Sequence, residues 1–278
     1  MKLHTTFRIG GNARLFIEPQ SEAELASVVK KCNDSNLDYF VLGNGSNLLV
    51  SDDGVSKVII HLGKGFDLLE MPDETTIVAH AGASLSSVCR FALSNGLSGL
   101  EFAYGIPGSV GGAAYMNAGA YGGQMSDVVF SCGHIDKNGN YGCLSGDELS
   151  FGYRKSAYCS DDLIITRVFF KLKKGNKEDI EAKMNELIQR RIDKQPLNFP
   201  SAGSVFKRPE GYFAGALIEQ SGLKGKRVGG AAVSEKHAGF IVNTGNATCG
   251  DVVELIELCR KTVFEKFKVN LETEIKKI

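Results

Sequence analysis

A run of small residues between two apolar segments marks the first place where this chain could bind a phosphate. Residues 39–42 and 48–50 have strand-like composition, and Gly43-Asn44-Gly45-Ser46-Asn47 connects them. Glycine adopts positive φ without steric penalty, so successive N–H groups of such a loop can converge on a phosphate. The spacing differs from the Gly-x-Gly-x-x-Gly dinucleotide fingerprint, and no helix is expected directly after it. Taken alone, the loop is equally well explained as a plain turn.

A second segment, residues 105–123, holds seven glycines and four alanines among nineteen residues. A loop this long and this poor in side chains loses entropy on folding and gains little burial, unless a large flat ligand supplies the missing contacts. Pro107-Gly108 predicts a turn, and Ser109 can begin a short helix whose N–H groups face a phosphate. We therefore expect a ligand to contact Gly105, Pro107, Gly108, Ser109, Gly111, Gly112 and Ala113.

Positive charge gathers in residues 195–240 of a chain whose formal charge is zero. Six cations against three glutamates give this segment a net charge of +3; the cations are Lys207, Arg208, Lys224, Lys226, Arg227 and Lys236. They could hold a diphosphate, although a solvated charged surface is an equally good explanation. The five histidines lack metal-ligand spacing, so we expect no metal site.

Four helices are expected to position these segments. One follows Ser21-x-x-Glu24, one follows Ser84 and ends at Asn95-Gly96, one runs from about Lys177 to before Pro196, and one follows Asp251. The expected strands are Arg14–Ile17, Tyr39–Leu42, Leu48–Val50, Val58–His61, Thr76–Ala79, Val128–Ile135, Leu163–Lys171, Gly239–Asn243 and Asn270–Ile275. Strands and helices do not alternate strictly, which predicts an α+β fold. The polar residues 173–178 favour a domain boundary near residue 175.

Composition limits the class of protein. Hydrophobic residues make up 43% and charged residues 23%, which is ordinary for a globular chain, and the balanced charge gives no field for nucleic acid or acidic membranes. The seven cysteines contain no Cys-x-x-Cys pair and favour buried, reduced thiols. No basic-then-apolar leader and no membrane-length apolar run occur. The expectation is a cytoplasmic protein without membrane insertion, nucleic-acid partner or metal.

Together, these motifs resemble the UDP-N-acetylenolpyruvoylglucosamine reductase family over nearly the whole chain. Thr6-Phe7-Arg8-Ile9-Gly10-Gly11 and the two glycine segments look like its FAD-binding lobe, which is of the vanillyl-alcohol-oxidase type. Residues 201–209, residues 214–219 and Leu271-Glu272-Thr273-Glu274 look like its C-terminal part. Family members usually have a short segment before the Thr6-Phe7-Arg8 motif. No tyrosine-loop insertion follows Leu163–Lys171, so the chain resembles the shorter, second type.

The resemblance implies two lobes. An FAD-binding domain of residues 1–175, with subdomains of about 1–60 and 61–175, precedes a smaller α+β substrate-binding domain of residues 176–278. It also implies that NADPH reduces the enolpyruvyl ether of UDP-N-acetylglucosamine enolpyruvate to UDP-N-acetylmuramate, in peptidoglycan precursor synthesis. FAD is expected to be non-covalent, because no histidine follows the first glycine loop, and the protein is expected to be a monomer.

The resemblance also implies residue roles. Arg154 matches the arginine that stabilises negative charge, Ser204 the proton donor and Glu274 the third catalytic group. Alone, Arg154 reads as a solvated surface residue and Ser204 as a turn hydroxyl, and strand periodicity does not choose between Glu272 and Glu274. The expected substrate contacts are Lys207, Tyr153 and Asn117. The first loop, Gly43, Asn44, Gly45, Ser46 and Asn47, is expected to contact FAD with the second.

Two other functions remain open from the residues. One is an FAD enzyme that oxidises an alcohol or hydroxy acid, whose reduced flavin would react rapidly with O₂. The other is a non-catalytic module that binds nucleotide sugars and purifies colourless. For the flavoenzyme, we expect Gly45→Val and Gly111→Val to fold yet lose flavin, because these glycines would admit the cofactor.

Overall fold

The computed structural model describes residues 1–160 and 162–278, and several of its helices begin at a side-chain cap. Ser21 Oγ accepts from Glu24 N before α1 (Glu22–Asp34), and Ser84 Oγ accepts from Ser87 N before α2 (Leu85–Ser94). The remaining α-helices are α3 (Val110–Tyr115), α4 (Lys177–Lys194), α5 (Ala214–Gln220) and α6 (Cys249–Phe267). The 3₁₀ turns are Lys2–His4, Lys64–Phe66, Glu101–Ala103, Met125–Asp127, Gly146–Leu149 and Ala157–Cys159.

All four expected helices are present, with one start corrected. α6 begins two residues before Asp251, because Thr248 is its N-cap and Asp251 closes a capping box from the first turn. The short helix expected after Ser109 is α3. The sequence reading did not include α5, whose seven residues are too few for a helical period to stand out.

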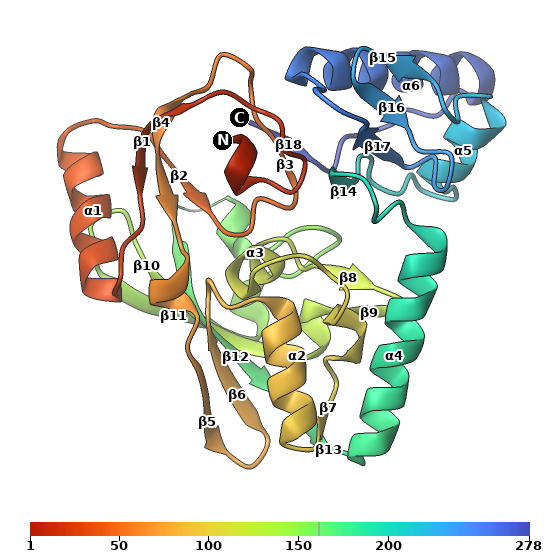
Figure 1. The fold of residues 1–278 in the computed structure, drawn as a ribbon. Helices are drawn as coiled ribbons and strands as arrows, with labels where there is room; N and C mark the ends of the chain where they lie inside the picture. Colours follow the sequence, from red (N-terminus) through yellow and green to blue (C-terminus); the bar gives the residue numbers. More distant parts are fainter. Residues whose placement is uncertain (161) are drawn as a thin grey trace. The chain divides into compact units, whose positions relative to one another are not determined.

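The chain forms two compact units, each with its own hydrophobic core (Figure 1). Unit 1 comprises Met1–Arg14, Gly45–Ser56 and Ile192–Ile278, and unit 2 comprises Leu15–Asn44 and Lys57–Arg191. The chain therefore passes from unit 2 to unit 1 near the end of α4, whereas the sequence indicated a boundary near residue 175. The functional division into residues 1–175 and 176–278 stays a prediction.

Two main sheets lie mostly in unit 2. One has the order β1 (Ala13–Ile17), β4 (Val55–His61), β2 (Tyr39–Leu42), with β2 parallel to β4. The other is antiparallel, in the order β11 (Tyr141–Ser145), β10 (Val129–Ile135), β12 (Ile164–Lys171), β6 (Thr76–His80), β5 (Leu69–Asp73). Two short ribbons are β13 (Lys173–Lys174) with β7 (Leu97–Ser98), and β8 (Gly119–Ala120) with β9 (Gly123–Gln124). The mixture of helices and strands confirms the α+β fold.

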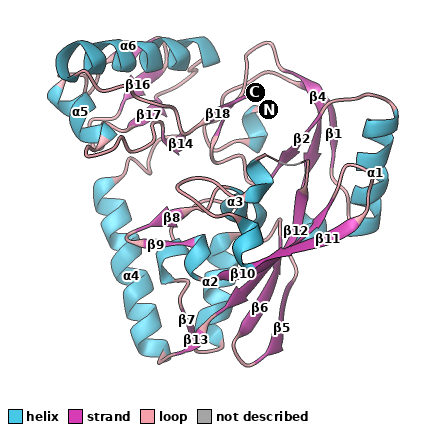
Figure 2. Cartoon of the chain, turned by 180° about the vertical axis from the view of Figure 1, so that it is seen from behind, coloured by secondary structure: helices cyan, strands magenta, loops and turns pink. Residues whose placement is uncertain are grey.

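Unit 1 contains one antiparallel sheet, in the order β14 (Ser201–Ser204), β17 (Phe240–Asn243), β16 (Ala231–Val233), β15 (Arg227–Val228). Figure 2 shows α5 and α6 beside this sheet. A separate parallel pair joins β18 (Lys276–Lys277) to β3 (Leu48–Leu49). The strand predicted over 270–275 is wrong in position: those residues make one isolated bridge, Thr273 to Phe206, and the ladder begins at Lys276.

Most of the expected core residues are buried, with a few exceptions. Five of the seven cysteine thiols are buried, but Cys143 and Cys159 are exposed because they lie on edge strand β11 and in the turn after residue 156. Ile192, near the end of α4, is apolar yet 46% exposed. Within the described residues, no helix is both long enough and apolar enough to cross a bilayer.

Candidate active site

The two glycine segments meet within unit 2, as a shared ligand site requires. Asn44 Nδ2 donates to Pro107 O at 3.5 Å, across sixty-three residues of sequence. A Cβ added to Gly43 would lie 2.1 Å from Ser109 Oγ. The glycine at position 43 thus permits close contact between the two loops themselves, rather than contact with a ligand.

The start of α3 differs from the expected phosphate site. The N–H groups of Val110 and Gly111 donate to Ala83 O and Ala81 O, both at 2.8 Å, and Gly112 N donates to Ser109 Oγ at 3.4 Å. The protein's own oxygens therefore satisfy the first three amides of this helix. The expectation that these amides face a phosphate is wrong, because the helix start is fixed against residues 81–83.

The surface beside these loops still suits a flat ligand. Asn44, Pro107 and Gly112 are exposed, whereas Ser109 and Gly111 are buried beneath them. A Cβ added to Gly112 would meet only Ser109 Oγ, at 3.3 Å. The exposed layer is thus backbone and small groups, which fits an extended ring system that needs close approach. Asn44 and the carbonyl and amide groups of residues 107–112 are the groups here that could hold FAD.

The remainder of the first loop belongs to unit 1. Gly45 has φ +60°, and a Cβ there would lie 2.2 Å from His4 O. Asn47 Nδ2 donates to Glu274 O at 3.1 Å, and Asn47 O accepts from Lys276 N at 2.9 Å. These residues fasten the loop to the first and last segments of the chain.

Arg154 is held in a tight turn of unit 2. Gly152 and Lys155 exchange two backbone hydrogen bonds, and Arg154 between them has φ +55°, a left-handed conformation that is uncommon outside glycine. Its Nη2 donates to Gly119 O at 3.4 Å, and its guanidinium lies 5.1 Å from the centre of the Tyr153 ring. Tyr153 is 55% exposed. The turn therefore places a strained arginine on the second glycine segment and leaves an aromatic ring in solvent beside it.

Asn117 is a support for that turn. Its side chain is buried, with Nδ2 donating to Gly152 O at 3.0 Å and to Gln124 Oε1 at 3.4 Å. Its Oδ1 accepts from Ser126 N at 2.9 Å. The amide expected to contact substrate is thus committed to the chain, and it fixes the residue two positions before Arg154.

Ser204, Lys207 and Glu274 come together in unit 1. Glu274 N donates to Val205 O at 2.7 Å, and Lys207 N donates to Glu272 O at 2.8 Å, so residues 272–274 run antiparallel to residues 205–207. Ser204 ends β14 after Gly203, whose φ of +78° accompanies a break in the pairing with β17. Ser204 is half-buried, and its Oγ makes no hydrogen bond to any described residue. A free hydroxyl therefore lies one residue from the backbone partner of Glu274.

The structure distinguishes the two glutamates. Glu272 is exposed, and its Oε2 pairs with Lys207 Nζ at 3.2 Å. Glu274 is half-buried and adjoins Asn47 through its carbonyl. Burial therefore favours Glu274 over Glu272 as the reactive carboxylate. Lys207 is partly exposed and already forms an ion pair with Glu272.

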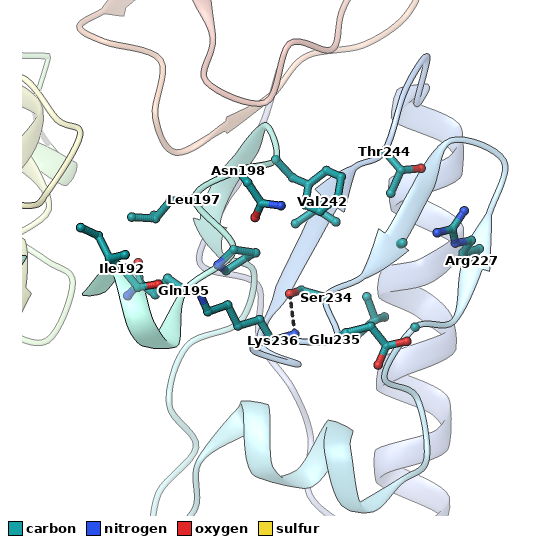
Figure 3. A pocket seen from close by; sticks show the side chains of 15 residues that line it. Ile192, Gln195, Leu197, Asn198, Arg227, Ser234, Glu235, Lys236, Val242 and Thr244 are labelled. Atoms are coloured by element: carbon teal, nitrogen blue, oxygen red, sulfur yellow. Dashed lines mark hydrogen bonds between the residues drawn. The ribbon is translucent and has the colours of Figure 1, made fainter. Parts of the chain in front are cut away.

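A separate hollow of about 500 Å³ lies in unit 1, between the segment after α4 and the β15–β16 hairpin (Figure 3). Its lining includes Gln195, Asn198, Arg227 and Lys236. Lys236 Nζ donates to Ile192 O at 2.5 Å. None of the residues expected to be catalytic or to contact FAD or substrate lines it, but Arg227 and Lys236 belong to the positively charged segment that could hold a diphosphate.

Two segments of the chain match known protein families. Residues 13–142 match the family described as FAD binding domain, so the chain is a flavoprotein with a vanillyl-alcohol-oxidase-type lobe. Residues 195–278 match the family described as UDP-N-acetylenolpyruvoylglucosamine reductase, C-terminal domain.

Full-length relatives identify the family. The UDP-N-acetylenolpyruvoylglucosamine reductase of Caldanaerobacter subterraneus is 51% identical, covering 99% of this chain and 91% of that protein. The Clostridium botulinum reductase is 49% identical, covering 99% and 90%. The crystal structure of the Thermus caldophilus reductase superposes with a TM-score of 0.86 at 39% identity, covering 99% and 96%. This chain belongs to the UDP-N-acetylenolpyruvoylglucosamine reductase family.

Proposed function

We propose that this protein is an NADPH-dependent flavoenzyme that reduces UDP-N-acetylglucosamine enolpyruvate to UDP-N-acetylmuramate, a step of peptidoglycan precursor synthesis. Family membership along 99% of the chain supports the reaction. The observation that carries the residue assignment is the pairing of residues 205–207 with 272–274, because it brings a free serine hydroxyl beside a half-buried glutamate.

In this proposal Asn44 and the backbone groups of residues 107–112 would hold FAD without a covalent bond. When bound, the flavin would supply the hydride, drawn from NADPH, that adds to the terminal carbon of the enolpyruvyl group. Arg154 then stabilises the negative charge that develops on the adjacent carbon and its carboxylate. A preorganised guanidinium is suited to this role, because it needs no reorganisation as charge develops.

Ser204 completes the reduction by donating its Oγ proton to that carbon, so one hydride and one proton have added across the double bond. A serine is a weak acid, so this role requires a strongly basic carbanion and a cation that stabilises the alkoxide left behind. Glu274 is the third catalytic group. Lys207 and Tyr153 contact substrate in this proposal, whereas Asn117 positions Arg154 through Gly152.

The first test is an absorbance spectrum of the purified protein, followed by NADPH consumption with and without the enolpyruvyl substrate. A yellow protein whose NADPH consumption depends on that substrate supports the proposal. Rapid re-oxidation of reduced flavin by O₂ alone would favour an oxidase. A colourless protein that binds UDP-sugar would favour a non-catalytic module.

We also propose that the enzyme works as a monomer in the cytoplasm. The neutral charge and the ordinary globular composition support this expectation. Light scattering of the purified holoenzyme should give a mass near 29.9 kDa, the mass of one chain.

A further inference from the structure

Helix α4 has one residue that breaks its own pattern. Its buried positions are Ile180, Met184, Leu187 and Arg191, spaced four, three and four residues apart, as on the apolar side of a helix. The next residue, Ile192, is apolar yet 46% exposed. An arginine therefore occupies a core-facing position, where leucine or isoleucine would pack more favourably. Such local conflicts with the folding pattern are most often found at functional positions.

Among the described residues, the guanidinium of Arg191 has no hydrogen-bond or ion-pair partner, and its nitrogen atoms keep some contact with solvent. The residue is 9% exposed, and no ion pair or side-chain hydrogen bond connects it to any residue in the ranges 1–160 and 162–278. Arg190 differs, because its Nη2 pairs with Glu186 in the exposed part of the helix. Burial of a charge without a partner is unfavourable, and this burial lowers the pKa of Arg191. A ligand with negative charge would remove that penalty.

The position of Arg191 indicates which ligand. A Cβ added to Gly105 would lie 3.0 Å from Arg191 Cδ, so the arginine stem runs against the start of the second glycine segment. The phenol of Tyr121, near the end of that segment, contributes to the electrostatic environment of Arg191. Figures 1 and 2 both show β8 and β9, which belong to the segment, beside α4. Arg154 contacts the same segment at Gly119, so two guanidinium groups serve one ligand-binding segment.

We propose that Arg191 binds a phosphate oxygen of a nucleotide held on residues 105–123. The inference rests on the proposed function, since both FAD and the UDP-sugar carry a diphosphate. The planar guanidinium suits this partner, because its N–H groups match two phosphate oxygens at once. Arg191 is therefore a binding residue and has no part in proton transfer.

The test compares Arg191→Met with Arg190→Met, its exposed neighbour, in the purified holoenzyme and after release of its flavin. Dissociation constants are measured for FAD by flavin fluorescence and for UDP by calorimetry. We expect Arg191→Met to weaken one of the two by about 10-fold to 100-fold, the range for a lost hydrogen bond to a charged group. Arg190→Met should bind both normally. Weaker FAD binding assigns the phosphate to the cofactor, and weaker UDP binding assigns it to the substrate.

Thermal melting provides a second readout that does not depend on turnover. Without ligand, Arg191→Met should melt no lower than wild type, because it removes an unpaired buried charge. Its stabilisation by the affected ligand should shrink. If Arg191→Met does not fold, Arg191→Lys replaces it in the test. This variant keeps the charge but loses the planar guanidinium, so it should also bind the affected ligand more weakly.

Wild-type affinity of the folded variants for both FAD and UDP would overturn the proposal and leave Arg191 a structural residue. Failure of the proposed function would look different, because the wild-type protein itself would then fail to bind FAD or fail to bind UDP.

Discussion

The side chain of Asn47 donates a hydrogen bond to the backbone carbonyl of Glu274 at 3.1 Å. This contact connects a residue expected to touch the cofactor with one expected to act on substrate, and both lie in unit 1. Because Lys276 N also donates to Asn47 O, Asn47 bonds to the backbone on either side of Ile275.

Asn47→Ala should therefore reduce turnover through Glu274. Loss of the donor leaves a carbonyl unsatisfied and frees the glutamate to move, so we expect kcat to fall by about 10-fold to 100-fold, as small misplacements of a catalytic group do. Steady-state kinetics with matched flavin content measures this. If flavin occupancy falls while kcat per bound flavin stays normal, Asn47 serves the cofactor and does not position Glu274.

Ser204→Ala separates the two halves of the reaction. The variant should accept electrons from NADPH at nearly the wild-type rate, since no carbon is protonated in that half. Electron transfer to the enolpyruvyl substrate should slow by about 10² to 10⁴, the usual contribution of a positioned acid. Stopped-flow absorbance follows each half separately, and Ser204→Cys should recover part of the loss. Normal re-oxidation of Ser204→Ala by substrate would make the residue a plain turn hydroxyl.

Gly45→Val is now expected to damage the fold, which revises the expectation from sequence. Its φ of +60° and the backbone of His4, 2.2 Å from an added Cβ, both oppose a side chain. Strain and overpacking together should lower the free energy of unfolding by about 2–5 kcal/mol. Gly112→Ala is the matched control, because its added Cβ meets only Ser109 Oγ. Urea denaturation of both variants measures the difference, and equal midpoints would contradict the prediction.

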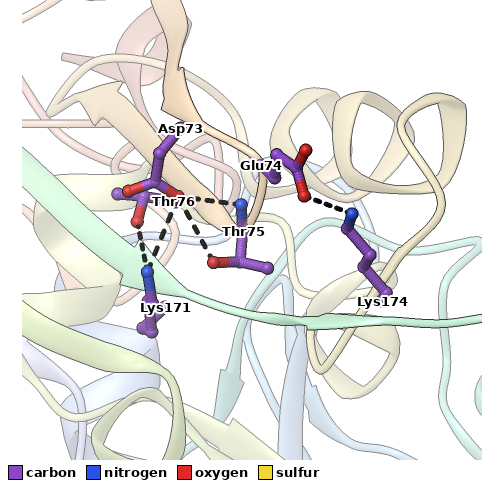
Figure 4. Close-up of polar contacts among 6 residues, drawn as sticks. All are labelled: Asp73, Glu74, Thr75, Thr76, Lys171 and Lys174. Carbon is purple, nitrogen blue, oxygen red and sulfur yellow. Dashed lines mark hydrogen bonds and ion pairs between the residues drawn. The ribbon is translucent and has the colours of Figure 1, made fainter.

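Asp73 should make part of the stability dependent on acid pH (Figure 4). The N–H of Thr75 donates to its carboxylate at 2.8 Å, and this bond, with support from Thr76 and Lys171, lowers the pKa of Asp73 to about 2. An unfolded aspartate has a pKa near 3.9, so the contribution is present above about pH 4 and is lost as pH falls toward 2. Denaturation curves of wild type and Asp73→Asn should therefore converge as pH falls through this range.

Added salt provides the control for that cause. The largest effect on Asp73 is a backbone hydrogen bond, which salt screens little, whereas the pair with Lys171 Nζ at 3.6 Å is exposed and readily screened. The difference in unfolding free energy between wild type and Asp73→Asn should persist in about 0.5 M salt. At this salt concentration the screening length is below about 5 Å. Its loss would assign the effect to the ion pair.

Local signals predicted the long elements, whereas the residue roles came from the family resemblance and stay predictions. Capping residues and helical periods located α1, α2 and α4, because those signals act within a few residues. The strand at residues 270–275 was misplaced because its partner, residues 205–207, lies far away in the sequence. The same holds for the amide groups of Val110 and Gly111, whose acceptors at residues 81–83 no local pattern could indicate.

Arg191 shows what a local pattern contained but did not reveal. Arg191 continues the four-three-four spacing of the buried residues that starts at Ile180, which marks it as core-facing. The neighbouring Ile192 is also compatible with the helical period and is apolar, so the sequence favours Ile192 as the buried residue. Only the observed burial distinguishes the two. Similarly, the family resemblance placed Asn117 at the substrate, whereas its bonds to Gly152 and Ser126 depend on tertiary structure.

The interleaved make-up of the two units has a consequence for synthesis on the ribosome. Unit 2 is complete in sequence at Arg191, so its core can assemble while later residues are still being made. Unit 1 begins with Met1 but needs Phe7, Ile9 and Leu49 in the same core as α6, and β3 acquires its strand partner only with Lys276. Phe7, Ile9 and Leu49 must therefore wait for residues made much later, in α6 and β18. A fragment cut at residue 191 or 175 should leave them without a core, so neither cut should release two intact halves.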